Sequence, residues 1–257
     1  MLESIVPVIL TLNEEANLRR VLTKLDWAKS ILVIDSYSDD NTEYIAKSFS
    51  NVIFYKRKFD SAANQWNFGI QLAAEHGNWI LALDADYLLS DELVAEMSEL
   101  VPDEDLTGFE ARFVYCIDGT PLNSSLYPEH TVLYRSGYGR YFQDGHTQRL
   151  LVQGRQGVLR HPIFHDDRKS PERWYREQLR YARMEAEKIR ATSWGQLSFS
   201  GKIRRVPLLS IALPCIYLLF YKGIWRNGRH GLKYVWQRSV AEWLIQKALW
   251  FRKPREV

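Results

Sequence analysis

Trp79-Ile80-Leu81-Ala82-Leu83-Asp84-Ala85-Asp86 is the stretch of sequence that decides the fold of this chain. Its first five residues are apolar and predict a buried strand, which ends in two carboxylates one residue apart. An acid pair there lies at the carboxyl edge of a sheet, where open α/β folds bind ligands. Mg²⁺ and Mn²⁺ prefer carboxylate oxygens, and substrate phosphates often complete their coordination. The pattern therefore indicates a metal-assisted site, with an ordinary strand-end turn as the alternative.

Strands and helices are expected to alternate around this stretch. Apolar runs predict buried strands over residues 5–10, 31–34 and 52–55, and helical patterns lie between and after them. Such alternation predicts an α/β fold with three layers and a mostly parallel central sheet. Three of the strands end in polar, acid-rich loops at one edge of the sheet. Farther along, Ser170-Pro171 predicts the start of a helix through N-cap and N1 preferences.

The composition is that of a folded globular protein. The chain has 257 residues, of which 46% are hydrophobic and 25% are charged. These values exclude a disordered or fibrous chain. Its two cysteines, Cys116 and Cys215, lie far apart without metal-ligand spacing, and no signal-peptide pattern opens the sequence. Both observations favour an intracellular protein with reduced thiols.

Three motifs follow one another at the ends of the expected strands. They are Thr11-Leu12-Asn13-Glu14-Glu15, the segment 34–42 with Asp35, Ser36, Ser38, Asp40 and Thr42, and Leu83-Asp84-Ala85-Asp86. As an ordered set they resemble the family 2 glycosyltransferases of GT-A fold. The resemblance implies a GT-A nucleotide-sugar-binding domain over residues 1–192 that transfers a sugar with inversion. It also implies Mn²⁺ or Mg²⁺ as cofactor.

The same resemblance assigns the metal ligands. Asp86 is expected to bind the metal directly, while Asp84 and Ala85 lie against the nucleotide sugar, with Asp84 facing the ribose or a metal-bound water. His165 precedes the helix beginning at Ser170 by the spacing of the family's metal-binding histidine, and imidazole is a suitable Mn²⁺ ligand. His161, four residues earlier, is the competing candidate.

Nucleotide binding is expected in the first two strand–helix loops. Thr11, Asn13 and Glu14 lie where backbone groups and a helix N-terminus hold a nucleotide. The resemblance implies that Asp35 accepts a hydrogen bond from the imide N–H of the base, which favours uracil. The alternative for Asp35 is a helix N-cap. Asn67 matches the family pattern better than its neighbour Asn64, and each is either a cap or a nucleotide ligand.

The catalytic base is the least specified part of the site. Inverting transfer needs a carboxylate or imidazole to accept the proton of the acceptor hydroxyl. Family members often carry a His-Glu pair here, whereas this chain reads Gln143-Asp144-Gly145-His146-Thr147-Gln148. Asp144 is therefore the candidate base and His146 the alternative, and either is also consistent with an ordinary loop residue.

The last part of the chain differs sharply in charge from the rest. Residues 202–257 carry 12 Lys+Arg against 2 Asp+Glu, although the net charge of the whole chain is only +3. Residues 206–221 are uncharged but include Pro207 and Pro214, and a spanning helix usually needs about twenty apolar residues. Trp236, Trp243 and Trp250 are seven apart and share a helix face.

These features predict a C-terminal helical module over residues 193–257 that lies on an anionic membrane without spanning it, with a break at Pro214. A core stripe of Trp residues is the alternative. Nucleic acid is not expected as a partner, because no binding motif is present.

The sequence as a whole predicts a metal-dependent inverting glycosyltransferase. Its donor is expected to be a UDP-sugar and its acceptor a lipid-linked saccharide in lipopolysaccharide or envelope polysaccharide synthesis. The expected location is the cytoplasmic face of the inner membrane, as a peripheral or monotopic protein. Two alternatives remain: a polyprenyl-phosphate glycosyltransferase, and an inactive membrane-bound protein that binds sugar nucleotides.

Overall fold

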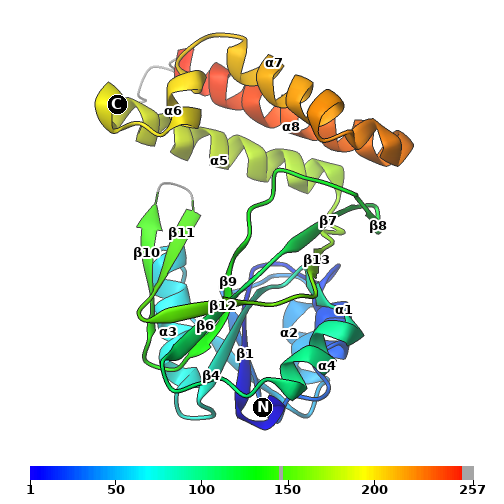
Figure 1. Cartoon of the computed structure of the whole chain (residues 1–257), viewed down its shortest axis with the longest axis vertical. Helices are drawn as coiled ribbons and strands as arrows, with labels where there is room; N and C mark the ends of the chain where they lie inside the picture. Colours follow the sequence, from blue (N-terminus) through cyan, green and yellow to red (C-terminus); the bar gives the residue numbers. More distant parts are fainter. Residues whose placement is uncertain (145–146, 251–257) are drawn as a thin grey trace. The chain divides into compact units, whose positions relative to one another are not determined.

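The computed structural model describes residues 1–144 and 147–250 (Figure 1). Contacts divide the chain into two compact units. The first comprises Met1–Pro121 and Tyr127–Arg168, and the second comprises Leu122–Leu126 and Lys169–Val257. The helix after Ser170 therefore belongs with the C-terminal helices by its contacts, while the predicted domain boundary after residue 192 stays a prediction.

A seven-stranded sheet with the strand order β12-β6-β9-β4-β1-β2-β3 forms the centre of the first unit. Within the group β4-β1-β2-β3 each strand is parallel to the next, and β12 is parallel to β6, whereas β9 runs antiparallel to both β4 and β6. The sheet is thus mixed, and the expectation of a mostly parallel sheet holds only for its β4 to β3 half. The bounds are β1 Ile5–Thr11, β2 Ile31–Asp35, β3 Val52–Lys56, β4 Trp79–Asp84, β6 Leu106–Ala111, β9 His130–Arg135 and β12 Arg155–Val158.

Helices cover both faces of this sheet and make three layers. One face packs against α1 (Leu18–Thr23), α2 (Thr42–Lys47) and α4 (Asp91–Glu99), through buried residues such as Leu22 and Met97. The other face packs against α3 (Ala62–Ala73), which buries Trp66. Because apolar side chains point to both sides of each strand, β1 and β2 are buried along nearly their whole length.

A smaller sheet lies at the end of the large one and carries His165. It has the order β5-β13-β7-β8, with β5 at Tyr87–Leu89, β7 at Phe113–Ile117, β8 at Thr120–Pro121 and β13 at Ile163–His165. Only Ala85 and Asp86 separate β4 from β5, so the acid pair lies at the junction of the two sheets. A separate hairpin is formed by β10 (Gly139–Asp144) and β11 (Thr147–Val152).

The second unit is helical. It contains α5 (Pro171–Ala191), α6 (Phe199–Arg204), α7 (Leu209–Ile216) and α8 (Gly228–Trp250). The predicted start of α5 is confirmed, because the Ser170 side chain accepts a hydrogen bond from the Arg173 N–H. The predicted break at Pro214 is wrong: α7 continues through this residue and passes into a single π turn over Tyr217–Tyr221. Among the described residues, no helix is both long and apolar enough to cross a membrane.

Candidate functional site

The acid pair lies where the sequence places it, at the carboxyl end of a central strand. Asp84 is the last residue of β4, which pairs with β1 on one side and with β9 on the other. Asp86 follows after the buried Ala85, and its own side chain is largely buried, with a residue exposure of 9%. The backbone carbonyl of Asp86 accepts a hydrogen bond of 3.0 Å from the Asp166 N–H, which ties the acid pair to the end of β13.

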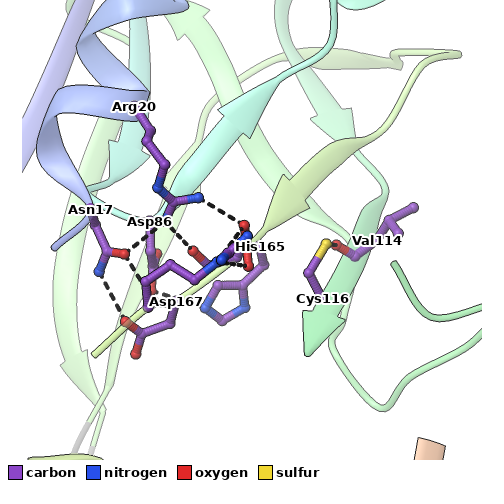
Figure 2. Close-up of polar contacts among 9 residues, drawn as sticks. Asn17, Arg20, Asp86, Val114, Cys116, His165 and Asp167 are labelled. Carbon is purple, nitrogen blue, oxygen red and sulfur yellow. Dashed lines mark hydrogen bonds and ion pairs between the residues drawn. The ribbon is translucent and has the colours of Figure 1, made fainter. Parts of the chain in front are cut away.

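His165 brings an imidazole to this acid pair. It ends β13, which pairs antiparallel with β5 so that His165 lies opposite Tyr87. Its Nε2 is 3.2 Å from Oδ2 of Asp86 (Figure 2). Burial disfavours the charged ring, yet the negative charges of Asp86, Asp84 and Asp167 outweigh this effect and raise the pKa of His165. The surrounding carboxylates thus favour the protonated, positively charged form of this imidazole.

Three tyrosine rings surround the imidazole. The ring centroid of His165 lies 5.4 Å from Tyr87, 4.7 Å from Tyr115 and 4.6 Å from Tyr127, each in an edge-to-face arrangement. The hydroxyl groups of Tyr87 and Tyr127 are hydrogen-bonded to each other. Burial, reinforced by the negative charge of Asp84, raises the pKa of both tyrosines, so both stay neutral. These rings fix the imidazole orientation and limit the access of water to it.

A polar network joins the segment after His165 to the start of α1. Asn17 donates from Nδ2 to Asp167 at 2.9 Å, and its Oδ1 accepts the Arg168 N–H at 2.9 Å (Figure 2). Arg20 forms a 2.7 Å ion pair with Asp166 and also donates to the Asp166 carbonyl. None of the motifs in the sequence pointed to these residues. The signal that could have found them is the run His165-Asp166-Asp167, because a buried acid such as Asp166 needs a cationic or amide partner.

The first two strand–helix loops are held together by side chains of the predicted nucleotide site. Thr11 donates to Asp35 at 2.9 Å, the Asn13 N–H donates to Ser38 at 2.7 Å, and the Glu14 N–H donates to Thr42 at 2.7 Å. Loops from β1 and β2 therefore form one polar surface beside β4. The role of Thr11, Asn13 and Glu14 in binding a nucleotide stays a prediction.

Asp35 is fully buried at the end of β2. Its Oδ1 accepts hydrogen bonds from the hydroxyl groups of Thr11 and Ser38, and its Oδ2 accepts the Ser38 N–H at 2.8 Å. Asp35 therefore closes the turn that follows β2, and the N-cap of α2 is Asn41 instead. The helix-cap interpretation is wrong, while the contact between Asp35 and a nucleotide base stays a prediction.

The two asparagines of α3 have different surroundings. The Asn67 side chain makes two hydrogen bonds with the backbone of Tyr141. Its Nδ2 donates to the Tyr141 carbonyl and its Oδ1 accepts the Tyr141 N–H, each at 2.9 Å. Asn64 donates to Asp60 at 3.0 Å. Asn67 thus ties α3 to β10, and any nucleotide contact by it stays a prediction.

One of the two candidate bases, Asp144, belongs to the hairpin. Asp144 ends β10 and pairs in register with Thr147, whereas His146 lies outside the described residues. The competing histidine, His161, is bound to Glu96, with 2.9 Å between Nδ1 and Oε2. The structure therefore brings His165, and not His161, to Asp86. The roles of Asp144 and His146 stay predictions.

The Asp86 carboxylate and the His165 imidazole are the donors that this site offers to a divalent cation. Within the described part of the chain, no group of three or more His, Cys, Asp or Glu side chains is arranged to enclose a metal. A carboxylate and an imidazole 3.2 Å apart do, however, suit Mn²⁺, which takes both donor types. His165 Nδ1 is buried without a hydrogen-bond partner in the described structure. Because Mg²⁺ is usually held by one or two carboxylates plus substrate phosphates, such an open site fits a metal that arrives with the nucleotide.

Comparison with known proteins places the chain among sugar-transferring enzymes. The glycosyl transferase family 2 pattern matches residues 7–164. The lipopolysaccharide core biosynthesis glycosyltransferase LpsC of Rhizobium meliloti (strain 1021) is 27% identical over 240 residues, covering 87% of this chain and 83% of LpsC. The crystal structure of S. aureus TarS 1-349 in complex with UDP-GlcNAc superposes with a TM-score of 0.50 and 11% identity, covering 95% and 90% of the two chains. These likenesses support a GT-A-like α/β fold with a mixed central sheet.

Proposed function

The chain belongs to glycosyl transferase family 2 and is a glycosyltransferase; we propose that it transfers a sugar, with inversion, from a UDP-sugar to a lipid-linked saccharide. The observation that carries the proposal is the Asp86–His165 pair at the carboxyl end of β4, beside the joined loops of β1 and β2. A nucleotide lying on these loops would direct its diphosphate toward the acid pair.

The nature of donor and acceptor is drawn from the relatives. TarS is described in complex with UDP-GlcNAc, and LpsC is described as acting in lipopolysaccharide core biosynthesis. We therefore propose that the donor of this chain is a UDP-sugar and that its acceptor is a saccharide carried on lipid. The buried Asp35, at the end of β2, is the proposed partner of the uracil imide.

Asp86 and His165 are the residues that would hold Mn²⁺ or Mg²⁺. When bound, the metal would offset the negative charge that develops on the departing diphosphate. The chain itself orients these two ligands: Tyr115 and Tyr127 pack on the imidazole, and the bonds from Asn17 to Asp167 and Arg168 hold the segment after β13. Asp84 is proposed to face the ribose or a metal-bound water.

The reaction then needs one proton transfer. The acceptor hydroxyl oxygen forms a bond to the anomeric carbon while the bond to the diphosphate breaks, and the nucleoside diphosphate leaves. Asp144 is the proposed acceptor of the hydroxyl proton, with His146 as the alternative.

Purified full-length chain incubated with a panel of nucleotide sugars and Mn²⁺ tests the proposal. We expect release of UDP from one donor and transfer to a lipopolysaccharide core acceptor. The Asp86→Asn variant should lose both activities, whereas Asp91→Asn, which alters an exposed acid on α4, should keep them. Turnover of a non-uridine donor alone would overturn the assignment of UDP. Full activity of Asp86→Asn would overturn the assignment of the site.

A further inference from the structure

Helix α7 has an outward face built only from apolar residues. The exposed positions recur at helical spacing and continue through the π turn: Leu209, Ala212, Leu213, Ile216, Tyr217 and Phe220. Phe220 has 79% of its surface exposed. A surface helix of a soluble protein normally shows the opposite pattern, with polar residues facing water.

The polar residues of this region face inward instead. Ser210 is buried and accepts a 2.8 Å hydrogen bond from Gln246 of α8. The Cys215 thiol lies 2.9 Å from the Ser239 hydroxyl. Deeper in the unit, Arg204 bridges Glu242 and Glu185 at 2.6 and 2.9 Å. Polar groups thus take part in the packing of α6, α7 and α8, while four apolar side chains of α7, Leu209, Ala212, Leu213 and Ile216, are exposed.

Helix α8 presents a second outward face of a different kind. Its exposed residues are aromatic, aliphatic or basic: Arg229, Leu232, Trp236, Trp243, Lys247 and Trp250. Ser239 and Gln246 contact α7, and each precedes a Trp of this face by four residues, Trp243 and Trp250 respectively. Because four residues are about one helical turn, this face runs beside the contact with α7. The Lys247 ammonium lies 5.1 Å from the centroid of the Trp243 ring.

The charged side chains along both faces are basic. No Asp or Glu occurs in residues 193–241, and the first acid after this range, Glu242, is buried against Arg204 and Arg238. Lys222 follows the π turn directly and lies within 6 Å of the Tyr217 ring centroid, and Arg226, four residues later, lies within 6 Å of the Trp225 ring centroid. Exposed basic groups therefore line the apolar surface.

We propose that the outward faces of α7 and α8 form a docking surface for an anionic lipid bilayer. The apolar stripe of α7 would enter the boundary of the acyl chains, and the Trp and basic residues of α8 would lie among the headgroups, where these residue types are favoured. No described helix can span a membrane, so the contact is monotopic. Charge complementarity selects an anionic lipid surface over a second copy, since two copies of this surface would repel each other. The surface shares no residue with the Asp86 site, so this inference does not depend on the proposed reaction.

Flotation of the full-length chain with lipid vesicles, in the absence of any nucleotide sugar, tests the inference. We expect binding to vesicles that contain phosphatidylglycerol, weaker binding to phosphatidylcholine alone, and partial loss at high salt. Phe220→Glu should lower the partition coefficient at least roughly tenfold, because a carboxylate is disfavoured among acyl chains and repelled by anionic lipid. Val101→Glu, at an exposed apolar position of the first unit, is the matched control and should bind like the wild type.

Two double variants separate the contribution of charge to vesicle binding from the contribution of the apolar contacts. Lys222→Gln with Arg226→Gln should weaken binding to anionic vesicles by roughly thirtyfold at low salt, whereas Lys58→Gln with Arg140→Gln should leave it unchanged. Equal binding to neutral and anionic vesicles would overturn the role of charge. An absence of vesicle binding would overturn the inference. Self-association of the wild type that Phe220→Glu abolishes in sedimentation would show that a second copy covers this surface instead. Unfolding midpoints identical to wild type are expected for all variants, because each changed side chain is exposed.

Discussion

The imidazole of His165 lies 3.2 Å from the carboxylate of Asp86, although 79 residues separate the two in the chain. The contact exists because β13 pairs with β5, which begins one residue after Asp86. Three tyrosine rings and the bonds from Asn17 then leave the imidazole little freedom to turn away. The two candidate metal ligands are thus fixed by the fold before any substrate is bound.

The first prediction concerns the metal. Asp86→Asn should lower sugar transfer at least about a hundredfold, because a positioned metal supplies several kcal/mol of transition-state stabilisation. EDTA should inactivate the wild type to the same extent, and added Mn²⁺ should restore it. Steady-state transfer rates check this, with Asp91→Asn as the control on α4. Full activity in EDTA would contradict a metal-dependent reaction.

The second prediction concerns the network that holds His165. Arg20→Gln should lower the free energy of unfolding by about 1–3 kcal/mol, because the buried Asp166 loses its closest cationic partner. Arg19→Gln, at an exposed neighbour on the same helix, should change it by less than about 0.5 kcal/mol. Urea unfolding followed by fluorescence measures both. Equal stability of the two variants would mean that the ion pair does not hold this segment.

The third prediction assigns the base. Asp144→Asn should lower transfer by roughly a hundredfold or more and leave the dissociation constant for UDP nearly unchanged, because the lost proton transfer is made only in the transition state. Rates and calorimetric titrations on the same protein separate the two effects. An active Asp144→Asn with an inactive His146→Ala would move the role to the histidine. Retained activity in both would favour a phosphate acceptor on a polyprenyl lipid, which needs no strong base.

The fourth prediction is a pH dependence of stability at Glu96. Burial alone would raise the pKa of this carboxyl, but hydrogen bonds from the Arg160 and His161 N–H groups and from the His161 ring lower it below its ordinary value near 4.5. The stabilising contribution is therefore present above pH 4.5 and is lost as the pH falls through the lowered pKa.

Glu96→Gln should accordingly destabilise the protein by about 1–2 kcal/mol at pH 7 and by progressively less below pH 4.5. Chemical unfolding at several pH values measures the difference. Glu99→Gln, which changes an exposed acid on the same helix, is the control and should show no such trend. A constant difference across this range would show that the charge of Glu96 is not what stabilises the contact.

Local sequence patterns were sufficient for most of the elements. The apolar runs of four residues before Asp35 and five before Asp84 predicted β2 and β4, because short apolar runs bounded by turn residues are typical of buried strands. Ser170-Pro171 predicted the start of α5 because the N-cap bond is formed within one turn. The break expected at Pro214 failed, because an i to i−4 bond lost at one residue does not end a helix that is packed against α8.

The sequence by itself determined the order of the motifs, the α/β pattern of the first 100 residues and the charge difference of the C-terminal part. Only the tertiary structure decided which distant residues meet: His165 with Asp86, Asn17 with Asp167, and Asn67 with the backbone of Tyr141. It also decided that β9 enters the sheet antiparallel and that the apolar face of α7 points outward. The reason is that periodicity records which residues share a face, whereas strand pairing and helix packing across long sequence separations decide what that face meets.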